Sequence, residues 1–313
     1  MSEFFSQIHF ENRDFFVLRD DLIDAEFNGN KARKLEFFLH ADLSAFNCIL
    51  SHGSSQSNAM SALSSFAKLK NLEFLYHPTH ISSFLAQNPC GNFAFALKNG
   101  MKIISQKSEF NSLKNSPSTL FIPEGVACKE AEQGFKSQAR LIDNLSAELG
   151  CDFDIFLPSG TGASAAFLAR NSRFSVFTTP CVGSPQYLAK QIFALVPDSK
   201  VRILPPAIKA YFGELKLDFL RIWQRLKEQT SITFELLYDP QGWLTLLANL
   251  SVFSKPVLYI HQGGLGGLAS QLARYERKFG LASLVYKIWQ QNDKTRIFKR
   301  TKGQKTTFSL FTR

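Results

Sequence analysis

Short apolar runs alternate with amphipathic stretches along most of the 313-residue chain. Apolar runs bounded by Gly, Pro, Asn or Asp predict buried strands. Such runs lie at 14–22, 47–51, 73–76, 102–104, 119–123 and 154–157. Stretches with helical spacing lie at 34–40, 57–69, 84–99, 131–149 and 165–170. Short apolar strands separated by helices predict an α/β protein whose sheets are mainly parallel and buried on both faces.

The length of the chain allows more than one hydrophobic core, so we expect two domains. Residues 1–35 and 143–313 are expected to form the larger domain, and residues 36–142 a smaller inserted one. Neither an internal repeat nor a Pro/Ser-rich linker marks the borders.

One polar segment, Phe27 to Glu36, places Lys31 directly after Gly29 and Asn30 and at the start of an expected helix. A glycine lets the backbone approach a ligand closely, and a helix start offers amide N–H groups to a phosphate. A lysine in this setting could form a Schiff base with pyridoxal phosphate. Taken alone, the segment could also be a basic turn that leads into a solvated helix.

A second segment, Leu157 to Ser164, lies between an expected strand and an expected helix. Gly160 and Gly162 would let the backbone wrap an anion, and the following helix would direct its amide groups at the same point. The segment lacks the Gly-Lys-Ser/Thr of a nucleotide-binding loop and the G-x-G-x-x-G of a dinucleotide site. It therefore predicts either a cradle for a single phosphate group or an ordinary tight turn.

Three further segments combine polar side chains with the expected ends of strands. Ser51 to Asn58 could cap a helix or bind a carboxylate. Leu237 to Trp243 places a phenol beside a carboxylate at the end of an expected apolar strand, and the alternative is an Asp-Pro turn. Tyr259 to Gly267 is rich in glycine, which indicates a close approach of backbone to a ligand or to another segment.

Composition and charge narrow the classes of function. The formal net charge is +10, and much of the excess lies within 294–305, but no nucleic-acid-binding motif accompanies it. We therefore expect small anionic ligands and no nucleic acid. Five scattered cysteines without a C-x-x-C pair predict neither a disulfide framework nor a metal site. Without a long apolar run or a secretory signal, we expect no membrane span and a cytoplasmic protein.

Taken in order, these segments resemble the pyridoxal-phosphate enzymes of the 1-aminocyclopropane-1-carboxylate deaminase and D-cysteine desulfhydrase family. The resemblance implies the two-lobed fold of the tryptophan synthase β-subunit, called fold type II. It covers nearly the whole chain and rests on Leu18–Leu22, Gly29–Glu36, Gln56–Asn58, Ser159–Gly162 and His261–Gly264.

The resemblance implies a role for each polar group that would hold the cofactor, pyridoxal 5'-phosphate. Lys31 would be the Schiff-base lysine, and Lys34 a nearby cation. Asn58 would contact the ring oxygen. The residues expected to hold the phosphate are Gly160, Thr161, Gly162, Ala163 and Ser164.

Other positions would serve the substrate and the electronics of the ring. Ser57 would supply a hydroxyl on the substrate side, and Tyr238 and Tyr211 would be the two active-site tyrosines. Asp239 stands where the family carries the partner of the pyridine nitrogen, a glutamate in the deaminases and a threonine in the desulfhydrases. A carboxylate there favours a protonated pyridine ring, so we expect a deaminase that converts a small amino acid to a 2-oxo acid and ammonia.

Two alternatives stay open at this point. The first is a D-cysteine desulfhydrase, which forms pyruvate, sulfide and ammonia by β-elimination. The second is a cofactor-binding homologue with little catalysis, because Pro240-Gln241 replaces the Gly-Lys of the family. Two further departures, Ala59 for a polar residue and Asn28 for a glycine, leave the substrate open. The resemblance also implies a homodimer.

Overall fold

The computed structural model describes residues 4–24, 26–27 and 29–280. Two compact units make up the chain, residues 1–271 and residues 272–313. Both sheets lie in the first unit. Helix α11 (Leu268–Phe279) begins in the first unit and ends in the second. In this helix the Tyr275 and Phe279 rings stack with centroids 6.0 Å apart. Asn28 and the basic residues 294–305 lie outside the described residues.

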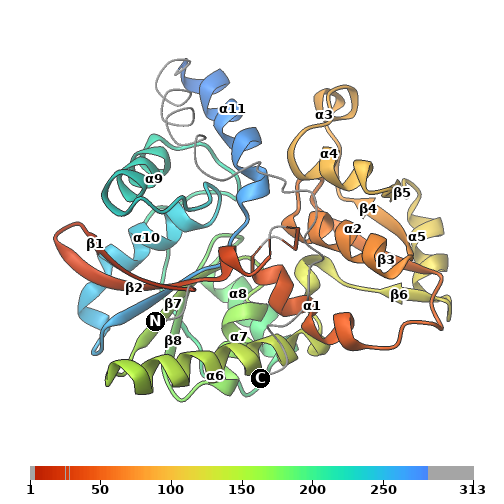
Figure 1. The fold of residues 1–313 in the computed structure, drawn as a ribbon. Helices are drawn as coiled ribbons and strands as arrows, with labels where there is room; N and C mark the ends of the chain where they lie inside the picture. Colours follow the sequence, from red (N-terminus) through yellow and green to blue (C-terminus); the bar gives the residue numbers. More distant parts are fainter. Residues whose placement is uncertain (1–3, 25, 28, 281–313) are drawn as a thin grey trace, which may run out of the picture. The chain divides into compact units, whose positions relative to one another are not determined.

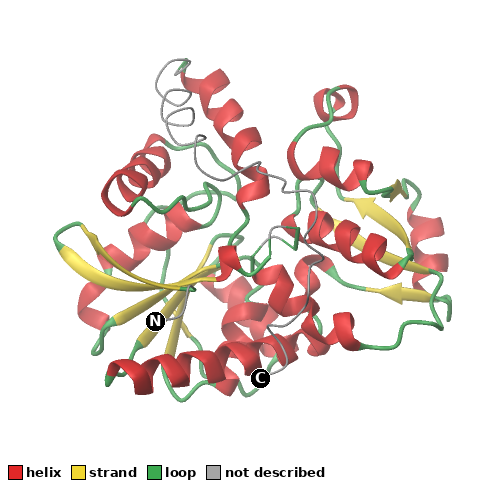
Figure 2. Cartoon of the chain, in the orientation of Figure 1, coloured by secondary structure: helices red, strands yellow, loops and turns green. Residues whose placement is uncertain are grey.

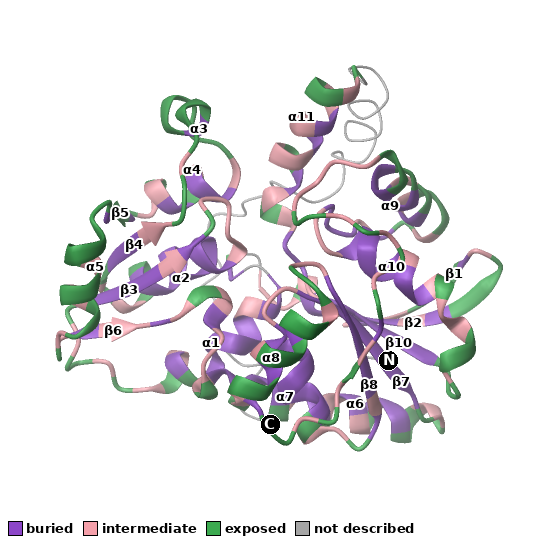
Figure 3. Ribbon diagram, turned by 180° about the vertical axis from the view of Figure 1, so that it is seen from behind, coloured by how far each residue is buried: buried purple, intermediate pink, exposed green. Residues whose placement is uncertain are grey.

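A six-stranded sheet has the strand order β1-β2-β10-β7-β8-β9. Its first two strands form an antiparallel hairpin, and every other pair is parallel. Figure 3 shows that β7, β8 and β10 are buried, as their apolar sequences require. The strand bounds are β1 Phe5–Phe10, β2 Arg13–Arg19, β7 Asp154–Ser159, β8 Ser175–Pro180, β9 Arg202–Ile203 and β10 Val257–His261.

Helices cover both faces of this sheet (Figure 1). Helices α6 (Glu132–Leu149) and α7 (Ala163–Asn171) lie on one face, and α9 (Leu217–Thr230) and α10 (Asp239–Ala248) lie on the other. Helix α8 (Pro185–Leu195) follows β8, and α1 (Asn30–His40) packs on α6.

A buried ion pair fixes α1 to the segment after β2. The Arg33 guanidinium donates to both carboxylate oxygens of Asp20 at 2.6–2.9 Å, and Gln138 Nε2 donates to Asp20 Oδ2 at 2.8 Å. Asp20 opens a short 3-10 turn, Asp20–Leu22, so the expected strand 14–22 ends early, at Arg19.

A four-stranded sheet in the same unit has the order β5-β4-β3-β6, with all pairs parallel (Figure 2). Its strands are β3 Cys48–Gly53, β4 Glu73–Pro78, β5 Lys102–Ile103 and β6 Thr119–Phe121. The helices that accompany it are α2 Asn58–Lys70, α3 Ser83–Gln87, α4 Gly91–Lys98 and α5 Lys107–Lys114. The remaining 3-10 turns are Glu124–Val126, Lys129–Ala131, Leu250–Val252 and Leu265–Gly267.

The α/β class with mainly parallel sheets is confirmed. The expected apolar strand before Tyr238 is wrong, because residues 231–238 are irregular. The physical reason is that the side chain of Glu235 takes the backbone N–H groups of residues 237–239, which a strand would offer to a neighbour. The division at residues 35 and 142 stays a prediction.

In the part of the chain that the structure describes, no helix is long and apolar enough to cross a bilayer.

Replacing Ser184 with alanine is expected to lower the free energy of unfolding by about 1 kcal/mol. Ser184 caps α8, and its hydroxyl accepts the Tyr187 N–H at 3.1 Å. Urea denaturation measures the loss. Ser112→Ala, within exposed α5, is the control because it removes no cap. A loss no larger than that of the control would contradict the prediction.

Candidate active site

The start of α1 rests directly on the turn after β10. The Asn30 N–H donates to the Gln262 carbonyl at 2.8 Å. Gly29 has a φ of 69°, and a Cβ there would lie 2.1 Å from the Gln262 oxygen. Only glycine fits such a conformation and such a close approach. The glycine before the lysine therefore lets the helix begin against this turn.

Lys31 is the second residue of α1, as expected. Its Nζ donates to Asn30 Oδ1 at 2.7 Å. Burial lowers the pKa of Lys31 to about 8, although the Glu235 carboxylate acts in the opposite direction. An amine with a pKa near 8 is neutral in a substantial fraction of molecules at physiological pH, and the neutral amine is the nucleophilic form.

Lys34 lies one helical turn further along α1. Its Nζ donates to the Gly125 carbonyl at 2.8 Å. Burial lowers the pKa of Lys34 well below its usual value, and the nearby Lys31 amine adds to this effect. The structure thus brings the two lysines close together, and the Gly125 carbonyl fixes the direction of the Lys34 amine.

Hydrogen bonds join the lysine segment to the glycine-rich loop between β7 and α7. Asn30 Nδ2 donates to Ser164 Oγ at 3.2 Å and to Gln262 Oε1 at 2.8 Å. Gln262 Nε2 donates to the Pro158 carbonyl at 2.7 Å. Three segments that are far apart in the sequence therefore meet within hydrogen-bonding distance.

The two glycines of this loop have different neighbours. A Cβ on Gly160 would lie 3.2 Å from Cε1 of Tyr238, whereas a Cβ on Gly162 would lie 2.6 Å from Cγ1 of Ile192, on α8. Gly162 also has a φ of 78°. Gly162 is therefore required by packing against α8, and Gly160 is the loop glycine that faces the tyrosine. Thr161 lies beside Gly125, whose Cβ would be 3.1 Å from the threonine methyl group.

The Gln56-Ser57-Asn58 segment opens α2. Ser57 Oγ accepts the N–H groups of Ala59 and Met60 at 3.1 and 3.3 Å, so the serine caps the helix. Asn58 Oδ1 accepts from Asn92 Nδ2 at 2.7 Å, and a Cβ on Gly264 would lie 2.9 Å from Asn58 Nδ2. The asparagine thus lies at the glycine turn that supports Lys31. Ala59 is 3% exposed and belongs to the hydrophobic core.

Tyr238 and Asp239 lie where irregular chain enters α10. The ring of Phe212 lies 5.3 Å from that of Tyr238, and burial raises the pKa of Tyr238. Asp239 is buried, and its Oδ1 accepts from the Tyr259 hydroxyl at 2.6 Å. Burial and the neighbouring Glu235 carboxylate raise the pKa of Asp239. Pro240 occupies the first turn of α10, where its missing N–H costs nothing.

Tyr211 is the expected site residue that the structure leaves exposed. It is 73% exposed, and its backbone N–H donates to Glu214 Oε2 at 3.1 Å. The neighbouring Phe212 provides the ring that contacts Tyr238. The role of Tyr211 stays a prediction.

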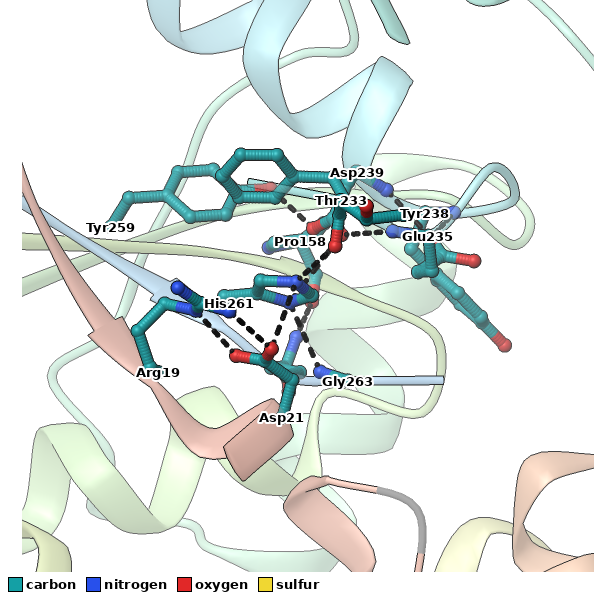
Figure 4. A network of polar contacts seen from close by, with 12 residues as sticks. Arg19, Asp21, Pro158, Thr233, Glu235, Tyr238, Asp239, Tyr259, His261 and Gly263 are labelled. Atoms are coloured by element: carbon teal, nitrogen blue, oxygen red, sulfur yellow. Dashed lines mark hydrogen bonds and ion pairs between the residues drawn. The ribbon is translucent and has the colours of Figure 1, made fainter. Parts of the chain in front are cut away.

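His261 holds the glycine turn in place from the end of β10 (Figure 4). Its Nδ1 accepts the Gly263 N–H at 3.2 Å, so its Nε2 donates to the Thr233 carbonyl at 2.9 Å. These two bonds require the neutral ring, and burial lowers the pKa of His261 in agreement.

Glu235 was not expected from the sequence, but it is 5% exposed and interacts electrostatically with Lys31. An acidic residue shortly before a helix start is a capping signal, and Glu235 stands four residues before Asp239, where α10 begins. The apolar residues around Glu235 favoured a strand at this place in the chain, so the capping signal was not recognised.

Comparison with known proteins finds the same fold in several solved structures. The "ACC deaminase homologue" gives a TM-score of 0.65 with 19% identity, covering 83% of this chain and 88% of its own. A pyridoxal 5'-phosphate-dependent aspartate racemase gives 0.60 with 13% identity, covering 83% and 89%. A hydrogen sulfide-producing enzyme from Fusobacterium nucleatum gives 0.57 with 11% identity, covering 84% and 96%. No family model and no curated protein sequence matches the chain. The likeness confirms the expected fold type II architecture.

Proposed function

We propose that this chain is a pyridoxal-phosphate-dependent enzyme that deaminates a small amino acid, resembling 1-aminocyclopropane-1-carboxylate, to a 2-oxo acid and ammonia. The proposal rests on the environment of Lys31. Its pKa is lowered, and the neighbouring Asn30, at the start of the same helix, donates a hydrogen bond to Ser164 beside the glycine-rich loop. Solved structures that share the fold include an ACC deaminase homologue and a pyridoxal 5'-phosphate-dependent racemase.

The residues present fit this cofactor. Gly160 adds no side chain between the backbone of the β7–α7 loop and the Tyr238 ring, and α7 directs its first N–H groups toward the same loop. Lys31 would hold the cofactor through its amine, and residues 160–164 would hold the phosphate. When bound, pyridoxal phosphate supplies an electron sink for the bonds to the substrate α-carbon.

The protein's own groups would then bind and orient the substrate. The Ser57 hydroxyl accepts N–H groups of α2 but can still donate its own proton, which suits a substrate carboxylate. Tyr238, beside Gly160, would face the substrate, and Asp239 would hold a proton at the pyridine nitrogen. We expect the enzyme to act as a homodimer.

β-Elimination from D-cysteine is the second candidate, and the fold shared with a hydrogen sulfide-producing enzyme favours it. A cofactor-binding protein with little catalysis is the third, because Pro240-Gln241 alters the start of α10.

One experiment tests these candidates together. A visible spectrum of the purified protein would reveal the bound cofactor, and small D- and L-amino acids would then be screened for 2-oxo acid and sulfide. 2-Oxobutanoate from 1-aminocyclopropane-1-carboxylate supports the deaminase, and sulfide from D-cysteine supports β-elimination. A cofactor band without turnover supports the third candidate, and a protein that binds no cofactor overturns the proposal.

Replacing Gly160 with alanine is expected to weaken pyridoxal phosphate binding roughly tenfold, equivalent to about 1.4 kcal/mol. The added methyl group would lie 3.2 Å from Tyr238 Cε1, so it would crowd the loop and displace the phenol. Fluorescence titration of the cofactor-free protein measures the dissociation constant. Gly267→Ala is the control, because its Cβ would meet only Asn92 Nδ2, at 3.7 Å. An unchanged dissociation constant in Gly160→Ala would rule out this loop as the phosphate cradle.

A further inference from the structure

The segment between β9 and α9 has no regular secondary structure, but hydrogen bonds hold it at two places. Near its start, the Ala207 N–H donates to Oγ1 of Thr245, a buried residue of α10, at 3.0 Å. Near its end, the Glu214 N–H donates to the Tyr211 carbonyl at 3.0 Å, and Glu214 Oε2 accepts the Tyr211 N–H at 3.1 Å. Residues 211–214 therefore form a tight turn with a defined conformation.

This turn places Phe212 at its corner. Gly213 follows with a φ of 77°, in the position of a β-turn that favours glycine. Lys216 Nζ forms an ion pair with Glu214 Oε1 at 3.2 Å, which holds the glutamate that closes the turn. The hydrogen bonds of the turn use other groups than the Phe212 side chain. The phenylalanine therefore has to be explained by what its ring contacts.

The Phe212 ring packs against Tyr238. The two ring centroids are 5.3 Å apart, and the ring planes are inclined by 50°. Tyr238 also lies against the glycine loop, because a Cβ on Gly160 would be 3.2 Å from its Cε1 and 3.3 Å from its hydroxyl oxygen. Phe212 is itself 37% exposed, so it covers the Tyr238 ring at the surface of the protein. The phenol thus has one neighbour in the β7–α7 loop and one in the 211–214 turn.

Burial is the main reason why the pKa of Tyr238 is raised. The acidic groups of Glu235, Cys181 and Glu124 act in the same direction, and they lie on other parts of the chain than the turn. A neighbour that keeps water away from the phenol therefore also keeps the proton on its oxygen.

We propose that Phe212 is a positioning residue for Tyr238, holding the phenol beside Gly160 and shielding it from water. The phenol would then meet the substrate in one orientation and as a proton donor. The inference rests on the proposed function in treating Tyr238 as a site residue. It gives the supporting role in this turn to Phe212 and not to the exposed Tyr211.

The test measures how readily Tyr238 reacts when the Phe212 ring is removed. Phe212→Leu keeps an apolar side chain and the hydrogen bonds of the turn. Tetranitromethane nitrates tyrosines in their ionised form, and peptide mapping by mass spectrometry compares Tyr238 with the exposed Tyr187 in the same sample. This ratio should rise roughly tenfold in Phe212→Leu, as a tenfold larger phenolate fraction requires. The buried Tyr259 should stay unreacted, which shows that the fold is retained.

Two control variants separate the contact from a general effect of substitution. Phe212→Trp keeps an aromatic ring at the corner of the turn and should restore the low ratio. Phe193→Leu makes the same change at a phenylalanine of α8 that is 68% exposed, and it should leave the ratio as it is. Should Tyr259 react in Phe212→Leu, Phe212→Met, with a longer apolar side chain, takes its place. An unchanged ratio in either folded variant would overturn the inference.

Kinetics provide a second readout. Phe212→Leu should lower kcat roughly tenfold and change KM less, because a misplaced proton donor affects the reaction more than binding. Unaltered kcat would show that the phenol works without this support and would overturn the inference. The nitration measurement needs no cofactor. A raised nitration ratio in a protein that binds no pyridoxal phosphate would uphold the support of Tyr238 by Phe212 and overturn the proposed function alone.

Discussion

Lys31→Ala is expected to abolish the visible absorbance band of the bound cofactor after dialysis and to lower turnover roughly 10³-fold or more, a barrier increase of about 4 kcal/mol. The substitution removes both the amine that would hold the cofactor and the group placed to transfer protons. Because the Asn30–Gln262 hydrogen bond at the start of α1 uses only backbone atoms, the fold should be retained. Absorbance spectroscopy and a 2-oxo acid assay provide the two readouts.

One control variant and one labelling experiment accompany this prediction. Lys98→Ala removes an exposed lysine at the end of α4 and should leave spectrum and turnover unchanged. Borohydride reduction of the unmodified protein followed by peptide mapping should label Lys31. A label on Lys34, whose amine lies nearby and is also buried, would overturn the assignment.

Asp239→Asn is expected to lower turnover roughly 10²-fold, a barrier change of about 3 kcal/mol. Burial raises the pKa of Asp239, and a protonated pyridine nitrogen beside it would favour its charged form; the substitution removes that proposed negative charge. An asparagine can still accept the Glu235 N–H and, by rotation of the hydroxyl, donate to Tyr259, so local geometry should survive. Cofactor affinity should change far less than turnover, which steady-state kinetics and a binding titration measure separately.

Tyr259→Phe is the matched control for Asp239, because it deletes the 2.6 Å hydrogen bond to Oδ1 and leaves the carboxylate in place. It should reduce turnover by a smaller factor than Asp239→Asn. A fully active Asp239→Asn protein would make Asp239 a structural residue of the α10 start. It would also remove the preference for deamination over β-elimination.

Local patterns predicted much of the fold. Helix α2 spans Asn58–Lys70 where 57–69 was expected, and β7 begins at Asp154 as expected. Both have strong signals of their own, a serine cap in one case and an unbroken apolar run in the other. The segment before Tyr238 has an equally apolar sequence but forms no strand, because the outcome there is decided by one buried carboxylate and its three N–H donors.

Some residues of the candidate site could be predicted from the sequence, and others could not. Lys31 and the glycine loop could be identified from the sequence because each needs a particular residue at a particular element end. Glu235 could not, because it lies far from Lys31 in the sequence and interacts with that lysine electrostatically only in the folded chain. Likewise, the sequence could not distinguish Gly162, required by Ile192 of α8, from Gly160, which faces Tyr238.

The pairing of β2 with β10 has a consequence for the synthesis of the protein. Strand β2, at Arg13–Arg19, finds its parallel neighbour only in β10, at Val257–His261. On the ribosome, the N-terminal hairpin must therefore wait, with one edge unpaired, until nearly the whole first unit has been made. Such long-range pairing slows folding and exposes a strand edge to other chains. A nascent chain released before residue 261 would lack both the central strand of the sheet and the turn on which Lys31 rests, so we expect truncated products to aggregate rather than to bind cofactor.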